Sequence, residues 1–164
     1  MIIYQCMLNG RQHRDLFALL NDDTVSQGVR DVLILTLLPA LHPPVARVKK
    51  GKGFWRPTIV ESMNGFIRHM KTLSDLQPEI DRRIEQMNQL KQRVQTYIII
   101  VGPELMSIQN LYVIIDNTIY YMESILKAVN ICFKICHALH ARYPVKSEQI
   151  WLLLQKCIYN MKTT

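Results

Sequence analysis

The feature that most constrains the fold is a change of residue periodicity near the middle of the chain. Residues 96–101 read Thr-Tyr-Ile-Ile-Ile-Val, and Gly102 with Pro103 ends this run. β-Branched and aromatic side chains favour strands, and a short apolar run bounded by turn formers is typical of a buried strand. We therefore expect a strand over residues 96–101.

Two further segments are expected to form a β-hairpin. Residues 111–115 and 119–122 are rich in Val, Ile and Tyr, and the sequence Asp-Asn-Thr at 116–118 separates them. Asp and Asn are common in tight turns, so strand formers on both sides of them predict an antiparallel pair. Together with residues 96–101, these segments predict a small antiparallel sheet.

Most of the remaining sequence has the apolar spacing of amphipathic helices. Pro39, Pro78 and Pro144 mark the ends or beginnings of such segments. The sequence therefore predicts an α+β fold that is mainly helical, with the small sheet flanked by pairs of helices. The expected helices lie near residues 16–20, 25–38, 59–70, 79–95, 123–142 and 147–161.

The composition divides the chain into three parts. Residues 1–42 are expected to form an N-terminal helical segment, and residues 58–164 an α+β core domain. The segment between them, residues 43–57, combines glycines and prolines with basic residues. Such a composition predicts a mobile linker.

This linker carries most of the excess positive charge. The chain has a formal net charge of +7, from 20 Lys or Arg and 13 Asp or Glu. Residues 43–57 contain five basic residues and no acidic residue, so the rest of the chain carries only +2. We therefore expect an acidic partner, either nucleic acid or an acidic protein, to bind at this segment.

Two functional interpretations of the linker are open. Lys49, Lys50 and Lys52 fit the loose pattern of a nuclear import signal, in which basic side chains lie on an accessible chain. Phe54 and Trp55 follow, and a ring beside basic residues can also stack on a base while the cations meet phosphates. The alternative is a solvated linker that Trp55 anchors to the core. The candidate contact residues are Arg47, Lys49, Lys50, Lys52, Trp55 and Arg56.

A narrow apolar stripe lies along the predicted helix 79–95. It could pack on the protein's own sheet or form the interface of a homodimer. Because it spans only about two heptads, fewer than the three or four expected of a coiled coil, packing within the domain is favoured. A homo-oligomerising scaffold is the alternative function. The residues of the stripe are Ile80, Ile84, Met87, Leu90 and Val94, and Glu79 and Arg83 on the same helix are spaced for an ion pair.

Cys132, Cys136, His137 and His140 resemble a metal site at first sight. Zinc requires about four converging ligands, but a helix turns His137 away from the apolar side that the other three share. We interpret the cysteines as buried core residues and expect no metal and no cofactor. Nucleophile-elbow and phosphate-loop motifs are missing, so we expect no enzyme. A small enzyme centred on Cys136, His137 or His140 is a further alternative.

The remaining features concern the cellular compartment. Four scattered cysteines do not suggest a disulfide framework, and the polar residues 9–14 do not suit a signal peptide. No apolar segment reaches the roughly 20 residues needed to cross a bilayer, so we expect no membrane partner. The leading hypothesis is a non-enzymatic intracellular interaction module, located in the nucleus or the cytoplasm with the nucleus favoured, whose linker contacts nucleic acid or an import receptor.

Overall fold

The structure is a computed structural model that describes residues 11–45, 47–50, 53–89 and 96–161, with the backbone alone at 11–13 and 48–50. The chain forms two compact units. The first contains residues up to Phe66 together with those from Tyr143 onward, and the second is Ile67–Arg142. The second unit is therefore continuous in sequence, and the first is made of the segments before and after it.

The second unit is built on a four-stranded sheet. Its strands are β3 (Ile67–Met70), β4 (Tyr97–Val101), β5 (Asn110–Ile115) and β6 (Thr118–Tyr121), in the order β3-β4-β5-β6. The three strands predicted from the sequence are confirmed within a residue of their expected bounds. The sheet is mixed rather than purely antiparallel, because β3 runs parallel to β4.

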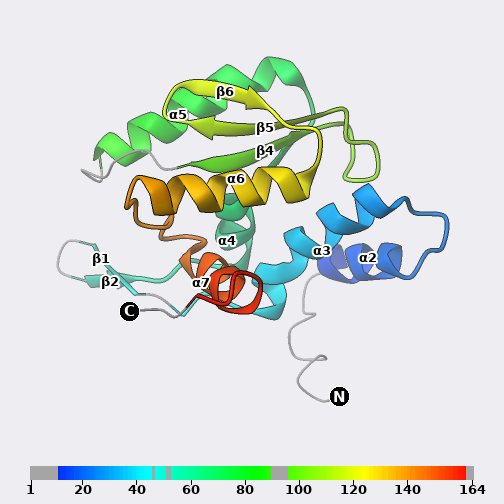
Figure 1. The fold of residues 1–164 in the computed structure, drawn as a ribbon, viewed down its shortest axis with the longest axis horizontal. Coiled ribbons are helices and arrows are strands. Elements are labelled where there is room, and N and C mark those ends of the chain that lie inside the picture. The colour runs from blue at the N-terminus through cyan, green and yellow to red at the C-terminus, as the bar shows by residue number, and fades with distance from the viewer. Residues whose placement is uncertain (1–10, 46, 51–52, 90–95, 162–164) are drawn as a thin grey trace. The chain divides into compact units, whose positions relative to one another are not determined.

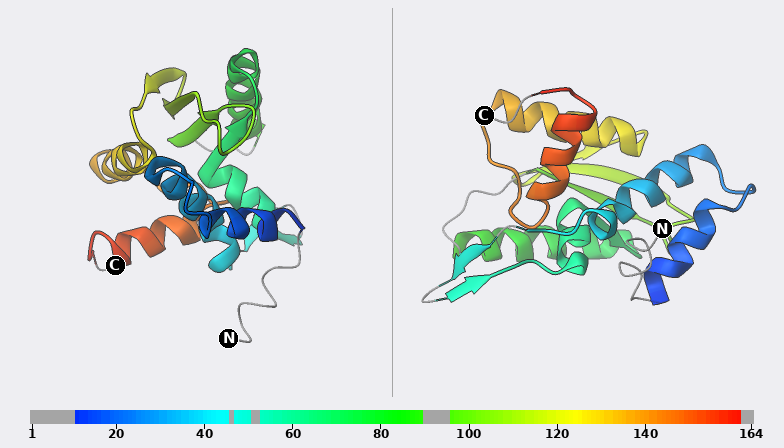
Figure 2. Two further views of the ribbon diagram at one scale, coloured as in Figure 1. Left: turned by 90° about the vertical axis from the view of Figure 1, so that its right-hand side faces the viewer. Right: turned by 90° about the horizontal axis from the view of Figure 1, so that it is seen from below.

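Two helices cover this sheet, α5 (Leu76–Gln89) on one face and α6 (Ile125–Ala138) on the other (Figures 1 and 2). Side chains alternate between the faces of a strand. Tyr97, Ile99 and Val101 pack with Ile80 of α5, and Thr96 approaches α6 at Cys136. All five residues of β4 are buried, which explains why the strand is apolar without alternation.

Strand β3 lies where the sequence predicted the continuation of a helix. Helix α4 (Ile59–Phe66) ends at Phe66, and the chain passes directly into β3. The register pairs Ile67 with Ile98 and Met70 with Val101. Pairing with a strand about thirty residues away along the chain overrides the local helical spacing, which continues through Met70 in the sequence.

The first unit consists of helices and one hairpin. Its helices are α2 (Arg11–Leu20), α3 (Gln27–Leu41), α4 and α7 (Glu148–Cys157), and its hairpin joins β1 (Val48–Lys50) to β2 (Gly53–Trp55). Trp151 of α7 is buried, with its ring edge-on to Phe66 and stacked on Tyr143. The Ser147 hydroxyl donates to the carbonyl of Gly65 at 3.2 Å, so the last part of the chain closes onto α4.

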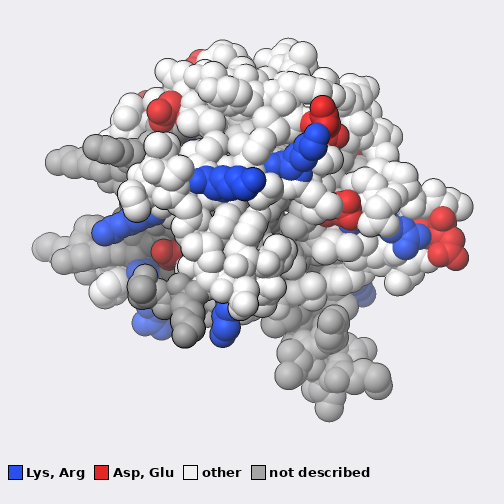
Figure 3. All heavy atoms as spheres, viewed as in Figure 1, with Lys and Arg blue, Asp and Glu red and all other residues white. Residues whose placement is uncertain are grey.

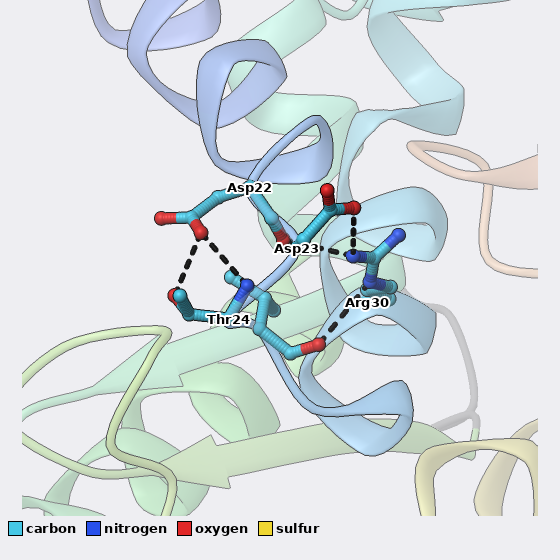
Figure 4. Close-up of polar contacts among 5 residues, drawn as sticks. Asp22, Asp23, Thr24 and Arg30 are labelled. Carbon is cyan, nitrogen blue, oxygen red and sulfur yellow. Dashed lines mark hydrogen bonds and ion pairs between the residues drawn. The ribbon is translucent and has the colours of Figure 1, made fainter.

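A network of polar contacts joins α2 to α3 (Figure 4). Asp22 accepts hydrogen bonds from the backbone and hydroxyl of Thr24, which lower the pKa of its carboxyl group. Arg30 donates to the carbonyls of Asp22 and Val25 and lies 3.7 Å from the Asp23 carboxylate. These contacts form a turn, so α3 begins after Ser26 rather than at the predicted residue 25.

Helix α3 also continues through Pro39 to Leu41, three residues beyond the predicted end at residue 38. Pro39 lies in the last turn and has no N–H, so the helix lacks the one backbone hydrogen bond that residue 39 would donate to the carbonyl of Leu35. Among the helices in the described part of the chain, none is both long and apolar enough to cross a membrane.

Candidate nucleic-acid interface

The predicted mobile linker contains a two-stranded antiparallel hairpin. The register pairs Val48 with Trp55, Lys49 with Phe54 and Lys50 with Gly53. Two of the candidate lysines therefore belong to a hydrogen-bonded strand. Three-residue strands of this kind hold the backbone positions of the basic and aromatic residues at defined separations.

The hairpin presents an aromatic side chain to solvent. Phe54 is 73% exposed, which is unusual for a phenylalanine, whereas Trp55 is half-buried. Arg47, directly before β1, is exposed. Lys52 lies outside the described residues. The exposed ring is therefore Phe54, and not Trp55 as the candidate set assumed.

Arg56 differs in role from the other basic candidates. Its Nε donates to the carbonyl oxygen of Pro44 at 2.7 Å. This bond connects the two chain segments at the base of the hairpin, and both flanking prolines, Pro44 and Pro57, are buried. Arg56 thus positions the hairpin in addition to contributing charge.

The charge of the hairpin is local. On the face of the molecule that Figure 3 shows, Lys and Arg side chains are scattered, and several lie beside Asp or Glu. Within the described residues, Lys127 pairs with Glu123 and Arg82 pairs with Glu79. Residues 43–57, in contrast, contain no acidic side chain that could neutralise their five cations.

The apolar stripe of α5 does not form an exposed surface. Ile80 is fully buried in the cluster around Tyr97 and Ile99, and Ile84 packs against the same cluster. Met87 is half-buried, while Leu90 and Val94 lie outside the described residues. The side chains of Ile80 and Ile84 therefore pack in the unit's own core.

The cysteines of α6 are also core residues. Cys132 and Cys136 are buried, and Thr96 Oγ lies 3.5 Å from Cys136 Sγ. Burial raises the pKa of both thiols, that of Cys132 to about 12. His137 contacts the ring of Phe133, and His140 is exposed after the helix. Within the described residues, no three His, Cys, Asp or Glu side chains gather as metal ligands do.

A cluster of three arginines in the second unit was not found from the sequence. Glu79 of α5 accepts two hydrogen bonds from Arg82, at 2.7 and 3.1 Å, and its carboxylate lies 3.3 Å from Nε of Arg68 on β3. Arg83 does not form the ion pair with Glu79 that the spacing predicted. Its guanidinium lies 3.8 Å from the centre of the Tyr97 ring instead.

Tyr97 of this cluster is buried, and Arg83 is half-buried. Burial lowers the pKa of Arg83 and raises the pKa of Tyr97 to about 12. Glu79, Arg82 and Arg68 all act electrostatically on Arg83. The sequence signal was limited to Glu79 and Arg83, because Arg68 and Tyr97 join the cluster only through the pairing of β3 with β4 and the packing of α5.

Comparison of the chain with models of protein families, with curated protein sequences and with solved structures gives no match in any of the three. The function is therefore argued from the two positively charged features, the hairpin and the arginine cluster.

Proposed function

We propose that this protein is a non-enzymatic interaction module that binds single-stranded nucleic acid through the β1–β2 hairpin. The observation that carries the proposal is the exposed ring of Phe54, which is paired in register with Lys49 and flanked by basic residues without a neighbouring acid. Phosphates meet the cations while an unstacked base lies on the ring.

The import-receptor interpretation is less favoured. It requires the basic residues to lie on an accessible, extended chain, whereas the backbone of Lys49 and Lys50 pairs with β2. Nucleic-acid binding has no such requirement, because cations and a ring on a hairpin reach their partner through side chains. The proposal locates the protein in the nucleus or cytoplasm, where such nucleic acids occur.

Binding of a fluorescent single-stranded oligonucleotide, measured by anisotropy, tests the proposal. The combined Lys49→Glu, Lys50→Glu and Lys52→Glu variant should lose most of its affinity. The control combines Lys71→Glu, Lys134→Glu and Lys156→Glu, three exposed lysines elsewhere, and changes the net charge equally. It should bind nearly as well as the unmodified chain, because the contact is local.

The aromatic contribution is tested separately. Phe54→Ala should weaken binding about tenfold, since stacking of one base contributes roughly 1–3 kcal/mol. Affinity should also fall steeply with added salt, because phosphate contacts release counterions. If the hairpin and control variants lose oligonucleotide affinity equally, the hairpin is not the binding surface. The same conclusion follows if the affinity changes neither with added salt nor in Phe54→Ala.

A further inference from the structure

The arginine cluster of the second unit has an excess of positive charge. The guanidinium groups of Arg68 and Arg82 contact the carboxylate of Glu79, and the charge of this carboxylate also acts on Arg83. Among the described residues, Arg83 lies within 4 Å of no carboxylate. All Asp and Glu side chains of the chain belong to the described residues, so the other segments contribute none. The three guanidinium groups therefore have one carboxylate in contact with them, and the charge of one further acid, Asp81, reaches Tyr97.

The same cluster contains two donors without hydrogen-bond partners. The hydroxyl of Tyr97 is buried, the residue being 1% exposed, and it bonds to no group in the described part of the protein. The buried Nε of Arg68 approaches Glu79 but forms no hydrogen bond with it. Buried donors are nearly always satisfied, and buried cations are nearly always paired. Both deficits are met by an anion that accepts hydrogen bonds.

We propose that Arg68, Arg82, Arg83 and Tyr97 form a binding site for a phosphate monoester. A phosphate monoester carries close to two negative charges near neutral pH and offers three acceptor oxygens. It therefore matches both the charge excess and the number of unsatisfied donors. Guanidinium groups bind phosphate oxygens in a fork geometry that suits this role.

Access to the site is through its two outer arginines. The side chain of Arg82 is 52% exposed and that of Arg68 is 32% exposed, whereas Glu79 is 10% exposed. A phosphate approaching from solvent first meets Arg82 and Arg68. Tyr97 lies deeper, at 1% exposed, and the guanidinium of Arg83 lies over its ring.

Titration of the full chain with inorganic phosphate, at ionic strength held constant with chloride, tests the site. Calorimetry should detect saturable binding, and the melting temperature should rise with phosphate concentration because only the folded state binds. Tyr97→Phe and Arg82→Gln should each weaken phosphate binding about tenfold, as expected for the loss of a hydrogen bond to a charged group. Tyr112→Phe and Lys134→Gln are the matched controls and should bind as the unmodified chain does.

Tyr97→Phe separates a binding role from a structural one. If the hydroxyl serves only the fold, its removal should leave phosphate binding unchanged and raise the melting temperature, since an unsatisfied buried group has been removed. That result would overturn the proposal. The proposal would also be overturned by a calorimetric signal or melting temperature that changes linearly with phosphate concentration and never saturates. Equal phosphate affinities of the Arg82→Gln and Lys134→Gln variants would overturn it as well.

The source of the phosphate is resolved in the Lys49→Glu, Lys50→Glu and Lys52→Glu background, which removes the hairpin contact. If a nucleoside monophosphate competes with inorganic phosphate and an oligonucleotide does not, the natural ligand is a free metabolite. Competition by an oligonucleotide with a 5′-phosphate, but not by one with a 5′-hydroxyl, indicates the end of a nucleic-acid chain. Competition by neither would contradict a monoester site. Because the background variant lacks the hairpin charges, failure here is distinct from failure of the hairpin proposal.

Discussion

Gly102 occupies a position in which no larger side chain fits. A Cβ built on it would lie 2.2 Å from the carbonyl oxygen of Ser107 and 2.9 Å from Cα of Ile108, both parts of the backbone. Its own backbone is also engaged, since its N–H donates to Met70 and its carbonyl accepts from Nε2 of His69. The turn after β4 therefore depends on close approach of two backbone segments.

We predict that Gly102→Ala lowers the free energy of unfolding by about 2 kcal/mol, because overpacking against backbone cannot be relieved by a side-chain rotation. Urea denaturation provides the measurement. Gly28→Ala is the control, since nothing lies within 4 Å of its Cβ position near the start of α3. There alanine should stabilise by about 0.5–1 kcal/mol through helix propensity. A destabilisation of equal size at both positions would contradict the packing argument.

The thiol of Cys132 should be inert in the folded protein. Burial raises its pKa to about 12, so it stays protonated where an exposed thiol ionises. Near pH 8.5, iodoacetamide should modify the exposed Cys157 and leave Cys132 unmodified until denaturant is added. Peptide mass spectrometry distinguishes the two sites. Equal rates at both cysteines would show that α6 opens readily.

The same shift implies a dependence of stability on pH. The pKa of Cys132 is higher in the folded state than the ordinary value of 9.0, so the unfolded chain loses this proton first. The stability contribution is therefore complete below about pH 9 and decreases as pH rises towards 12. A Cys132→Ala variant should show a smaller loss of stability over this interval in chemical denaturation at each pH.

At the scale of single elements, α4 begins with a reciprocal pair of hydrogen bonds. The hydroxyl of Thr58 accepts from the backbone of Glu61 at 3.1 Å, and the Glu61 carboxylate accepts from the backbone of Thr58 at 2.9 Å. This is a capping box, and it satisfies donors that the first helical turn leaves free. Thr58 is therefore the N-cap residue of α4, directly before the expected helix start near residue 59.

Thr58→Ala and Glu61→Ala should each lower the free energy of unfolding by about 1 kcal/mol. The double variant should lose less than the sum of the two, because both side chains serve one motif. Glu104→Ala, an exposed acid outside any helix, should change stability by less than about 0.5 kcal/mol. Strict additivity in a double-mutant cycle would argue against the box.

The sequence predicted elements well where the local signal and the tertiary environment agree. Residues 97–101 are apolar throughout because both faces of β4 are covered, so composition alone identified the strand. Strand β3 was missed because its four residues are helical by spacing and become a strand only by pairing with β4. The hairpin at 48–55 was missed for the opposite reason, since the sequence Gly-Lys-Gly at 51–53 is typical of a flexible linker.

The candidate sites also differ in how much of each could be recognised from the local sequence. The basic residues of the hairpin were visible as a charge run, whereas their arrangement on two strands was not. The arginine cluster combines Arg68, Glu79 and Tyr97 from three different elements, and their meeting is a product of β3–β4 pairing and α5 packing. No spacing rule along a single chain reports such a contact, because strand register is set over long sequence separations.

At the scale of the whole molecule, the two units differ in which parts of the chain they need in order to fold. The second unit is continuous in sequence, and all strands of its sheet lie between Ile67 and Arg142. The first unit is discontinuous and needs its C-terminal part. Trp151 packs on Phe66, Ser147 bonds to the carbonyl of Gly65, and Gln149 contacts His42 at 2.7 Å.

Deletion of residues 143–164 should therefore unfold the first unit and spare the second. In hydrogen exchange followed by mass spectrometry, α3 and α4 should lose protection, because the removal of α7 uncovers the apolar surface around Phe66. The amides of β4, which pair with strands on both sides, should remain the slowest to exchange. Deletion of residues 158–164 is the control and should leave both units protected, because it retains all of α7 and the contacts of Ser147, Gln149 and Trp151. Loss of protection in β4 equal to that in α3 would show that the sheet, although continuous in sequence, depends on the first unit for its stability.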